Sequence, residues 1–227
     1  MEVIDFFNRQ QAIISAEQQE KLSLSHVLVA GVGGLGSPVC QQLVRLGVGN
    51  LHIVDRGILD PPDLNRQVLY TTADLGKAKV AVAAPALEQI GMGTRVFPYQ
   101  VTIDATFELP EEIDYVIDCL DNFEARYFLD DAVQKRGIPM VHGGIHGMFG
   151  QLTTILPGQT QSLRSLFGDM VPDLKGKIPV MAPIPSLIAS FQVTEFVKLF
   201  CQLDHTLVGR LIRIDLTDYS FELTEID

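Results

Sequence analysis

Residues 26–36 read HVLVAGVGGLG, an apolar segment that runs directly into a glycine-rich loop. The five residues His26–Ala30 are typical of a short buried strand in a parallel sheet. Apolar residues at helical spacing over Ser37–Leu46 predict a helix behind the loop. Glycines let such a loop turn tightly and bring its amides close to an anion, and the helix N-terminus adds partial positive charge. This G-x-G-G-x-G pattern predicts a phosphate-binding loop. Its glycines are Gly31, Gly33, Gly34 and Gly36.

An acidic residue follows the next predicted strand. Leu51–Val54 is apolar and ends at Asp55, 19 residues beyond Gly36. A carboxylate at that strand end can accept hydrogen bonds from ribose hydroxyls. The loop and Asp55 together indicate nucleotide binding, but they do not separate a dinucleotide from ATP.

The remaining segments alternate between strand and helix patterns, which predicts a parallel sheet covered on both faces. The fold class is therefore α/β: a Rossmann-like, mostly parallel sheet with a mixed antiparallel β end and an N-terminal helical arm. Helices are expected over Lys77–Ile90, Phe123–Gly137 and Ser186–Phe200, and strands over Arg95–Tyr99, Asp114–Cys119, Pro139–His142, Gln151–Leu156, Arg210–Asp215 and Tyr219–Thr224. The last two strands are expected to form a hairpin, and Leu163–Pro185 a connection rich in Pro and Gly.

One domain is expected over residues 1–227, because no linker or repeat divides the chain. We divide it into a helical arm (1–22), a nucleotide-binding part (23–150) and a C-terminal part (151–227). The arm is predicted from apolar residues set among polar ones, beginning with Val3 and Ile4.

Composition excludes several classes of protein. The formal net charge is −11, which disfavours binding to a nucleic-acid backbone. No apolar run is long enough to predict a membrane span, and the N-terminus lacks the pattern of a secretory signal. The cysteines at 40, 119 and 201 form no CxxC pair, which suits a reducing cytoplasm.

Three further segments point to a triphosphate rather than to NAD. Asp63-Leu64-Asn65-Arg66-Gln67 follows Asp55, and Lys79 opens the next predicted helix. Asp118-Cys119-Leu120-Asp121-Asn122 ends a later strand. Two cations and a carboxylate beside one phosphate loop suit nucleotidyl transfer, because cations hold the phosphates and a carboxylate holds Mg²⁺. A dehydrogenase does not need this collection.

These segments together resemble the ThiF/MoeB/HesA family, relatives of the ubiquitin-activating enzymes. The similarity runs from Arg9 to about Thr224 and keeps its motifs in order: Arg9-Gln10, GVGGLGSP, GVGNLHIVD, LNRQ, DLGKAK, DCLDNFEAR and QVTEFVKLF. The resemblance implies ATP and Mg²⁺ as cofactors and adenylation of the C-terminal glycine of a ubiquitin-like sulfur-carrier protein ending in Gly-Gly. It also implies a homodimer, with residues 151–227 as the carrier-binding part.

The resemblance implies roles for individual residues. Asp55 would hold the ribose, and Arg66 and Lys79 would contact the phosphates. Asp121 would bind Mg²⁺, and Arg9 would reach the phosphates of a partner subunit. The remaining positions expected at the nucleotide are Gln67, Asp63 and Asn122, whereas Lys77 is expected to be a surface residue. A plain ion pair between Arg66 and Asp121, and a solvated Arg9, are the alternatives for these residues.

The chain departs from the family pattern at several positions. Asp63 stands where many members have asparagine, and Gly57 replaces a second aspartate. Ser162 and Ser165 match the first two of four cysteines that often bind zinc, so no structural zinc is expected. No cysteine lies between positions 119 and 201, so the reaction is expected to stop at the acyl adenylate. The histidines at 142 and 146 are expected to be lining or core residues.

Four hypotheses remain open at this point. The first is adenylation of a Gly-Gly carrier, in a thiamine, molybdopterin or other sulfur-requiring pathway. The second is adenylation of a different substrate, such as a peptide precursor or a modified tRNA nucleoside. The third is a nucleotide-binding regulator that has lost catalysis, which Asp63 and Gly57 favour. The fourth is a dehydrogenase, which explains Asp55 but not Arg66, Lys79 and Asp121 together.

Overall fold

The computed structural model describes residues 6–168 and 179–226. Its centre is an eight-stranded sheet in the order β3-β2-β1-β4-β5-β6-β7-β8. The strands are β1 (His26–Ala30), β2 (Asn50–Val54), β3 (Arg95–Tyr99), β4 (Tyr115–Asp118), β5 (Met140–His146), β6 (Phe149–Ile155), β7 (Arg210–Asp215) and β8 (Ser220–Glu225). The neighbouring strands β3, β2, β1, β4 and β5 run parallel to one another. Strands β6, β7 and β8 continue the sheet with antiparallel pairs. The predicted α/β class, mostly parallel sheet and antiparallel end are confirmed.

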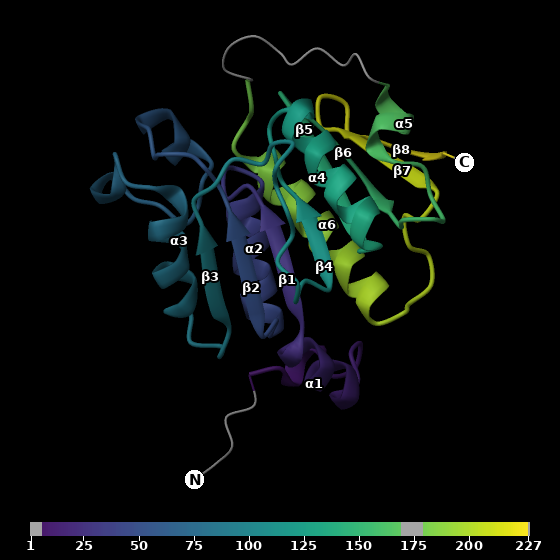
Figure 1. Ribbon diagram of the computed structural model, residues 1–227, viewed down its shortest axis with the longest axis horizontal. Helices are drawn as coiled ribbons and strands as arrows, with labels where there is room; N and C mark the ends of the chain where they lie inside the picture. The colour runs from purple at the N-terminus through teal and green to yellow at the C-terminus, as the bar shows by residue number, and fades with distance from the viewer. Residues whose placement is uncertain (1–5, 169–178, 227) are drawn as a thin grey trace.

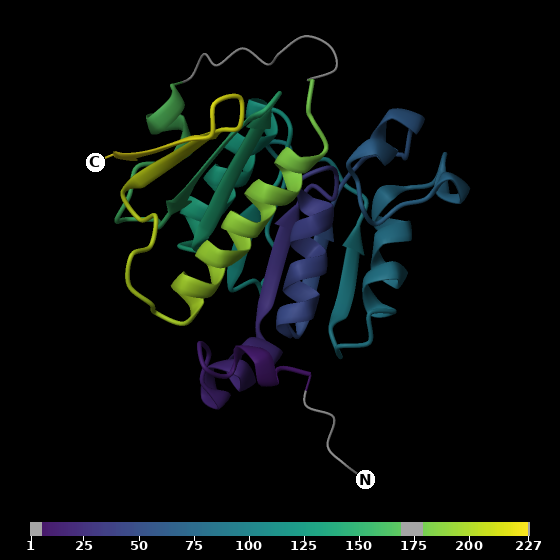
Figure 2. The same ribbon diagram turned by 180° about the vertical axis from the view of Figure 1, so that it is seen from behind.

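Helices cover both faces of the sheet (Figures 1 and 2). They are α1 (Ala16–Leu24), α2 (Gly36–Leu46), α3 (Lys79–Glu88), α4 (Phe123–Arg136), α5 (Leu163–Phe167) and α6 (Pro183–Phe200), with short 3-10 turns at Asn8–Gln10, Pro61–Asn65 and Thr72–Asp74. Helix α2 packs against α6 and α3 on one face, which Figure 2 shows from the front. Helices α4 and α5 contact each other on the opposite face.

The alternation of side chains along β1 divides the interior into two cores. Val27 and Val29 belong to the cluster beneath α2, α3 and α6. Leu28 and Ala30 belong to the cluster beneath α4 and α5. All four are fully buried, because a strand covered on both faces exposes neither set of side chains. This burial explains why β1 reads as a continuous apolar run.

The N-terminal arm is only partly helical. Helix α1 begins at Ala16 and is capped by Ser15, whose side chain accepts a hydrogen bond from the amide of Gln18 in a capping box. A 3-10 turn, Asn8–Gln10, precedes it. The expected helix over 1–22 is therefore wrong in its extent, and its first five residues, including Val3 and Ile4, lie outside the described residues. Figure 1 shows α1 at the foot of β1, the end of the strand opposite the glycine loop.

Several predicted boundaries need correction. Lys77 lies outside α3, which begins at Lys79 after the extended residue Ala78. Strand β5 continues four residues beyond His142, because the antiparallel strand β6 pairs along its whole length. The segment 163–185 holds helix α5 and the first turn of α6, although part of it lies outside the described residues. No other expected strand or helix is missing from the parts of the chain that the structure describes.

No helix within residues 6–168 and 179–226 has both the length and the apolar character needed to cross a membrane.

Acid is expected to destabilise the fold through His52. This residue on β2 is 3% exposed and contacts His26, Phe97 and Tyr99. Burial, and then the charge of His26, lower the pKa of His52 to about 4, against the opposing effect of Glu112. The folded state therefore keeps this imidazole neutral, while the unfolded chain protonates it below pH 6.5. The free energy of unfolding should fall by about 2 kcal/mol between pH 7 and pH 5.

Urea unfolding at pH 7, 6 and 5 tests this expectation. The His52→Gln variant, which has no titrating group at this position, should show a shallower loss of stability over the same range. The same pH dependence in both proteins would show that other groups cause the acid sensitivity.

Candidate functional site

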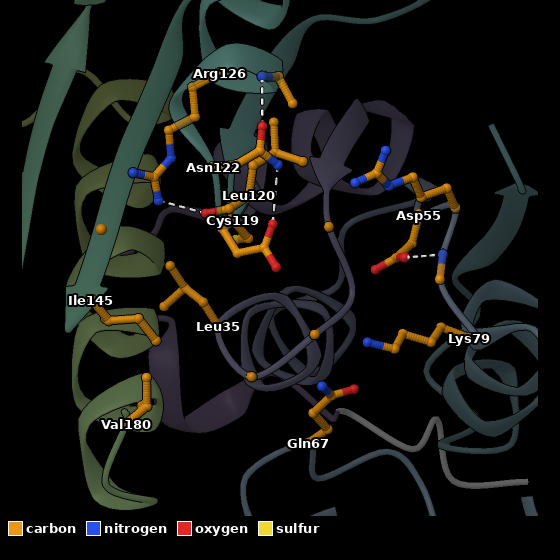
Figure 3. Close-up of a pocket in the computed structure, with 18 of the residues that line it drawn as sticks. Leu35, Asp55, Gln67, Lys79, Cys119, Leu120, Asn122, Arg126, Ile145 and Val180 are labelled. Atoms are coloured by element: carbon orange, nitrogen blue, oxygen red, sulfur yellow. Dashed lines mark hydrogen bonds between the residues drawn. The ribbon is translucent and has the colours of Figure 1, made fainter. Parts of the chain in front are cut away.

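A large pocket lies at the carboxyl ends of β1, β2 and β4. The chain turns from β1 outward to β2 on one side, and β4 pairs with β1 on the other. The loops after these strands therefore diverge and leave a crevice, the usual ligand site of an open parallel sheet. The cavity measures about 1110 Å³. Figure 3 shows Asp55 and Lys79 on one side of it and Arg126 and Ile145 on the other.

The four predicted glycines have different roles. Gly31, Gly33 and Gly34 line the pocket, whereas Gly36 does not. Cβ atoms at Gly33 and Gly34 would meet only the side chains of Gln67 and Arg66. A Cβ at Gly36 would lie 1.8 Å from the carbonyl oxygen of Gly31. The last glycine therefore permits the close packing of α2 on the loop, and its predicted contact with a cofactor is not supported by its position.

Gly31 allows the glycine loop to pack closely against Cys119, the residue after β4. Its φ of +90° is unfavourable for other residues, and a Cβ there would lie 2.8 Å from the carbonyl oxygen of Cys119. The loop after β1 and the loop after β4 are therefore held in direct contact at the floor of the pocket.

Asp55 anchors the glycine loop as well as lining the pocket. Its carboxylate accepts hydrogen bonds from the amides of Val32 at 2.8 Å and Gly57 at 2.6 Å. A carboxylate has further acceptor sites, so Asp55 remains able to accept from ribose hydroxyls. Steric crowding also favours glycine at position 57, because a Cβ there would lie 2.8 Å from Asp55 Oδ1 and 3.2 Å from Lys79 Cε.

Lys79 is positioned by backbone pairing. The Lys79 amide donates to the carbonyl of Gly57, and the Leu59 amide donates to the carbonyl of Lys77. The Lys79 side chain is 14% exposed and lines the pocket (Figure 3), whereas Lys77 is exposed and pairs with Asp74 at 3.0 Å. Lys79 thus lies in the pocket and Lys77 on the surface, as predicted.

Asp63 lies between the two cations that were predicted to hold phosphate. Its Oδ2 is 3.4 Å from Lys79 Nζ, and its Oδ1 is 3.7 Å from Arg66 Nη2. Arg66 also donates to the carbonyl of Pro62 and to the side chain of Asn65. The alternative pairing of Arg66 with Asp121 is absent from the ion pairs of the described residues.

Asp121 and Asn122 follow β4 at the pocket. The Asn122 side chain caps α4 by accepting from the Ala125 amide at 2.8 Å, and its amide donates to Asp121 Oδ1 at 3.1 Å. The side-chain oxygen and the side-chain amide of Asn122 thus both form hydrogen bonds with neighbouring residues. Its position therefore favours a structural role over the predicted contact with a cofactor. Asp121 is exposed in the pocket.

The donor set at Asp121 suits Mg²⁺. Mg²⁺ is usually held by one or two carboxylates together with substrate phosphates and waters. Within residues 6–168 and 179–226, no three His, Cys, Asp or Glu side chains form a cluster able to hold a metal alone. An exposed carboxylate in the same pocket as the glycine loop therefore fits a metal ion that is held jointly with a bound phosphate ligand.

A buried ionic network on the other side of the pocket was not predicted. Asp118 and His142 are fully buried, with His142 Nδ1 2.7 Å from Asp118 Oδ2, and Arg126 Nε is 3.6 Å from the same oxygen. Arg126 also donates to the carbonyls of Leu120 and Gly143. Burial lowers the pKa of His142, although the hydrogen bond to Asp118 opposes the shift. The network fixes a cation, Arg126, at the wall of the pocket.

Sequence signals for this network are weak. Arg126 lies one turn after Asn122, a spacing that also suits an exposed helix position. The histidines at 142 and 146 share a strand face by their spacing, yet only His142 is buried, while His146 lines the pocket. Within the described residues, Arg126 Nε, His142 Nε2 and Gln67 Oε1 are buried polar atoms without a hydrogen-bond partner. Other lining residues that the sequence did not indicate are Val101, Thr102, Ile103, Phe149, Gln151, Phe167 and Val180.

Arg9 does not reach this pocket. It lies in the exposed 3-10 turn at the foot of β1, and it is not among the lining residues. The other predicted residues do line the pocket: Asp55, Asp63, Arg66, Gln67, Lys79, Asp121 and Asn122.

The cysteines are buried free thiols. Cys40, Cys119 and Cys201 are each 7% exposed or less, and burial raises the pKa of all three. A raised pKa disfavours the reactive thiolate. Their environment therefore favours a structural role over a nucleophilic one. The serines at the expected zinc positions are engaged locally: Ser162 caps α5, and Ser165 donates to Gln161.

Comparison with known proteins finds a matching family profile, relatives at 34% and 35% identity, and solved structures with the same fold. The profile of the ThiF family matches residues 7–227. The SAMP-activating enzyme E1 of Haloferax volcanii is 35% identical over 92% of this chain and 79% of that protein. The sulfur carrier protein adenylyltransferase of Thermus thermophilus is 34% identical over 97% of this chain and 86% of that protein. The crystal structure of E. coli MccB with succinimide has a TM-score of 0.85 at 19% identity, covering 99% of this chain and 72% of that one, and so shows a shared fold.

Proposed function

The chain belongs to the ThiF family, and from this premise we propose that it adenylates the C-terminal glycine carboxylate of a ubiquitin-like sulfur-carrier protein. The names of its relatives in Haloferax volcanii and Thermus thermophilus support the substrate class. The observation that carries the proposal is the convergence of Arg66, Lys79 and Asp121 on one pocket beside the glycine loop.

Each side of the pocket has a role in the proposed reaction. The amides around Gly33 and Gly34 and the cations Arg66 and Lys79 bind the phosphates of ATP. Asp55 orients the ribose. Asp121 holds Mg²⁺, which neutralises phosphate charge when it is bound. The pocket thus positions two reactants and offsets charge, which is the main requirement of phosphoryl chemistry.

The chemical step needs no nucleophilic side chain. A carboxylate oxygen of the carrier attacks the α-phosphorus of ATP and forms a carboxylate–phosphorus bond. The bond from that phosphorus to the bridging oxygen breaks, and pyrophosphate leaves with the electron pair. The buried thiols of Cys119 and Cys201 support a reaction that ends at the acyl adenylate.

The C-terminal tail of the carrier is proposed to enter along β5. Gly144, Ile145 and His146 line the pocket there, and a Cβ at Gly144 would lie 3.4 Å from Gln151. Glycine at 144 leaves the β5 backbone without a side chain at this point, which suits an extended tail that ends in glycines. The C-terminal part, residues 151–227, supplies the neighbouring wall through Gln151, Phe167 and Val180.

A homodimer is part of the proposal because of Arg9. Arg9 is exposed and does not line its own pocket, which suits a contact with the phosphates bound by a second copy. The whole chain acts as one domain in this proposal. The free thiols support a cytoplasmic location, since such thiols persist in reducing compartments.

A nucleotide-binding protein without turnover is the second candidate function. The observation that favours it is Asp63, whose carboxylate pairs with both Lys79 and Arg66. If this pairing persists with ATP bound, the cations are unavailable to stabilise the departing pyrophosphate.

ATP–pyrophosphate exchange tests both candidates. With Mg²⁺ and a carrier ending in Gly-Gly, the purified protein should incorporate labelled pyrophosphate into ATP. A matched carrier extended by one residue beyond the final glycine should give no exchange, because its carboxylate is displaced from the α-phosphorus. ATP binding without exchange with any carrier would favour the second candidate, and absence of ATP binding would contradict both.

A further inference from the structure

We propose that Asp63 makes the pocket discriminate against metal-free ATP in favour of its Mg²⁺ complex. The proposal rests on the proposed function in taking this pocket as the ATP site. It assigns to Asp63 a specificity role that is separate from phosphate binding by Arg66 and Lys79.

Asp63 is held in place by its own backbone. It is the third residue of the 3-10 turn Pro61–Asn65, and its Oδ2 accepts from the Asp60 amide at 3.2 Å. Its side chain is 16% exposed, so it is partly shielded from water. From this anchored position the carboxylate lies within 4 Å of the charged nitrogens of Arg66 and Lys79. An anion entering between the two cations therefore meets a fixed negative charge as well.

The pocket as a whole is not strongly positive. The carboxylates that line it are Asp55, Asp60, Asp63, Asp121 and Glu124, and the cations are Arg56, Arg66, Lys79 and Arg126. Arg126 is already paired with the buried carboxylate of Asp118. A polyphosphate in the described part of this pocket is therefore opposed by at least as many carboxylates as it has cations to bind.

The charge of the ligand then decides how strongly it binds. The Mg²⁺ complex of ATP carries about two fewer negative charges than metal-free ATP, because the ion is divalent. Repulsion from Asp63 acts on both forms but is larger for metal-free ATP, since Coulomb energy scales with ligand charge. An asparagine at this position keeps the oxygen that accepts from the Asp60 amide and removes the charge. The variant Asp63→Asn thus isolates the electrostatic effect.

Isothermal titration calorimetry with the purified chain tests the proposal without any carrier. ATP is titrated once with excess Mg²⁺ and once with EDTA, at a fixed ionic strength. In Asp63→Asn the affinity for metal-free ATP should rise about tenfold, while the affinity for the Mg²⁺ complex should rise only about threefold. Asp63→Glu, which keeps the charge, should retain the discrimination of the original protein.

Asp74→Asn is the matched control. Asp74 is also the third residue of a 3-10 capping box, and it also pairs with a cation three residues later, Lys77. It lies outside the pocket lining. This substitution removes the same charge from the same kind of turn, so it should leave both affinities for ATP unchanged.

Two results would overturn the proposal. The first is an unchanged ratio of the two affinities in Asp63→Asn, in a variant whose thermal unfolding shows that it is folded. The second is a smaller ratio caused by weaker binding of the Mg²⁺ complex, which would make Asp63 a ligand of the metal. Failure of the original chain to bind ATP in either form would instead contradict the proposed function.

Discussion

Replacing Lys79 with alanine is expected to reduce carrier-dependent ATP–pyrophosphate exchange by about 100-fold or more. The Lys79 side chain is 14% exposed and enters the pocket from the first residue of α3. It is the proposed cation for the charge that develops on the departing pyrophosphate, so its loss raises the barrier of the chemical step. Its removal also leaves the longer contact to Arg66 as the one ion pair of Asp63 among the described residues, which adds to the unfavourable charge facing the phosphates.

Lys77→Ala is the control for this prediction. Lys77 lies two residues away, is exposed, and pairs with Asp74 outside the pocket. Its substitution removes the same charge from nearly the same position in the sequence, and it should leave exchange within about twofold of the original rate. Urea unfolding of both variants separates loss of catalysis from loss of structure. Equal exchange by the two variants would contradict the assignment of Lys79.

Replacing Gly36 with alanine is expected to destabilise the fold by about 3 kcal/mol or more. The added Cβ would lie 1.8 Å from the carbonyl oxygen of Gly31 and 2.8 Å from the carbonyl carbon of the same residue. Neither atom belongs to a flexible side chain. Helix α2 would therefore have to move away from the loop, and the contacts of its buried face with α6 would be disturbed.

Gly33→Ala tests whether the effect is specific to the packing glycine. A Cβ at Gly33 would meet only the Gln67 side chain, at 3.7 Å, and its backbone conformation is accessible to alanine. This variant should unfold at nearly the same urea concentration as the original protein, although its affinity for ATP is a separate question. Similar losses of stability in the two variants would show that the glycines of the loop are not divided between packing and binding.

The sequence was sufficient wherever a local pattern has one structural solution. The bounds of β1, β3 and β7 agree with their predicted residues. For β1, an apolar strand next to turn glycines, little freedom remains, because a buried backbone must pair along its whole length. The prediction was poorer for α5, where a five-residue helix begins at a serine cap inside a segment that reads as irregular.

The candidate site was predictable as a set of segments, but not as a set of contacts. The carboxyl ends of parallel strands meet at one edge of a sheet, so the loops holding Asp55 and Asp121 had to converge. The order of the motifs contains that information. It contains no information on which carboxylate pairs with which cation, and the pairing of Asp63 with Lys79 was therefore not foreseen.

What the sequence by itself determined was the α/β fold, the pocket beside the glycine loop and the resemblance to the ThiF family, because these follow from periodicity and from motifs in order. Only the tertiary structure decided the packing role of Gly36, the network that joins Arg126, Asp118 and His142, and the distance of Arg9 from its own pocket. These depend on where atoms lie in space, which the order of the residues does not state. Folding places them within a few ångströms of one another, or keeps them apart, and contact energies decline steeply over such distances.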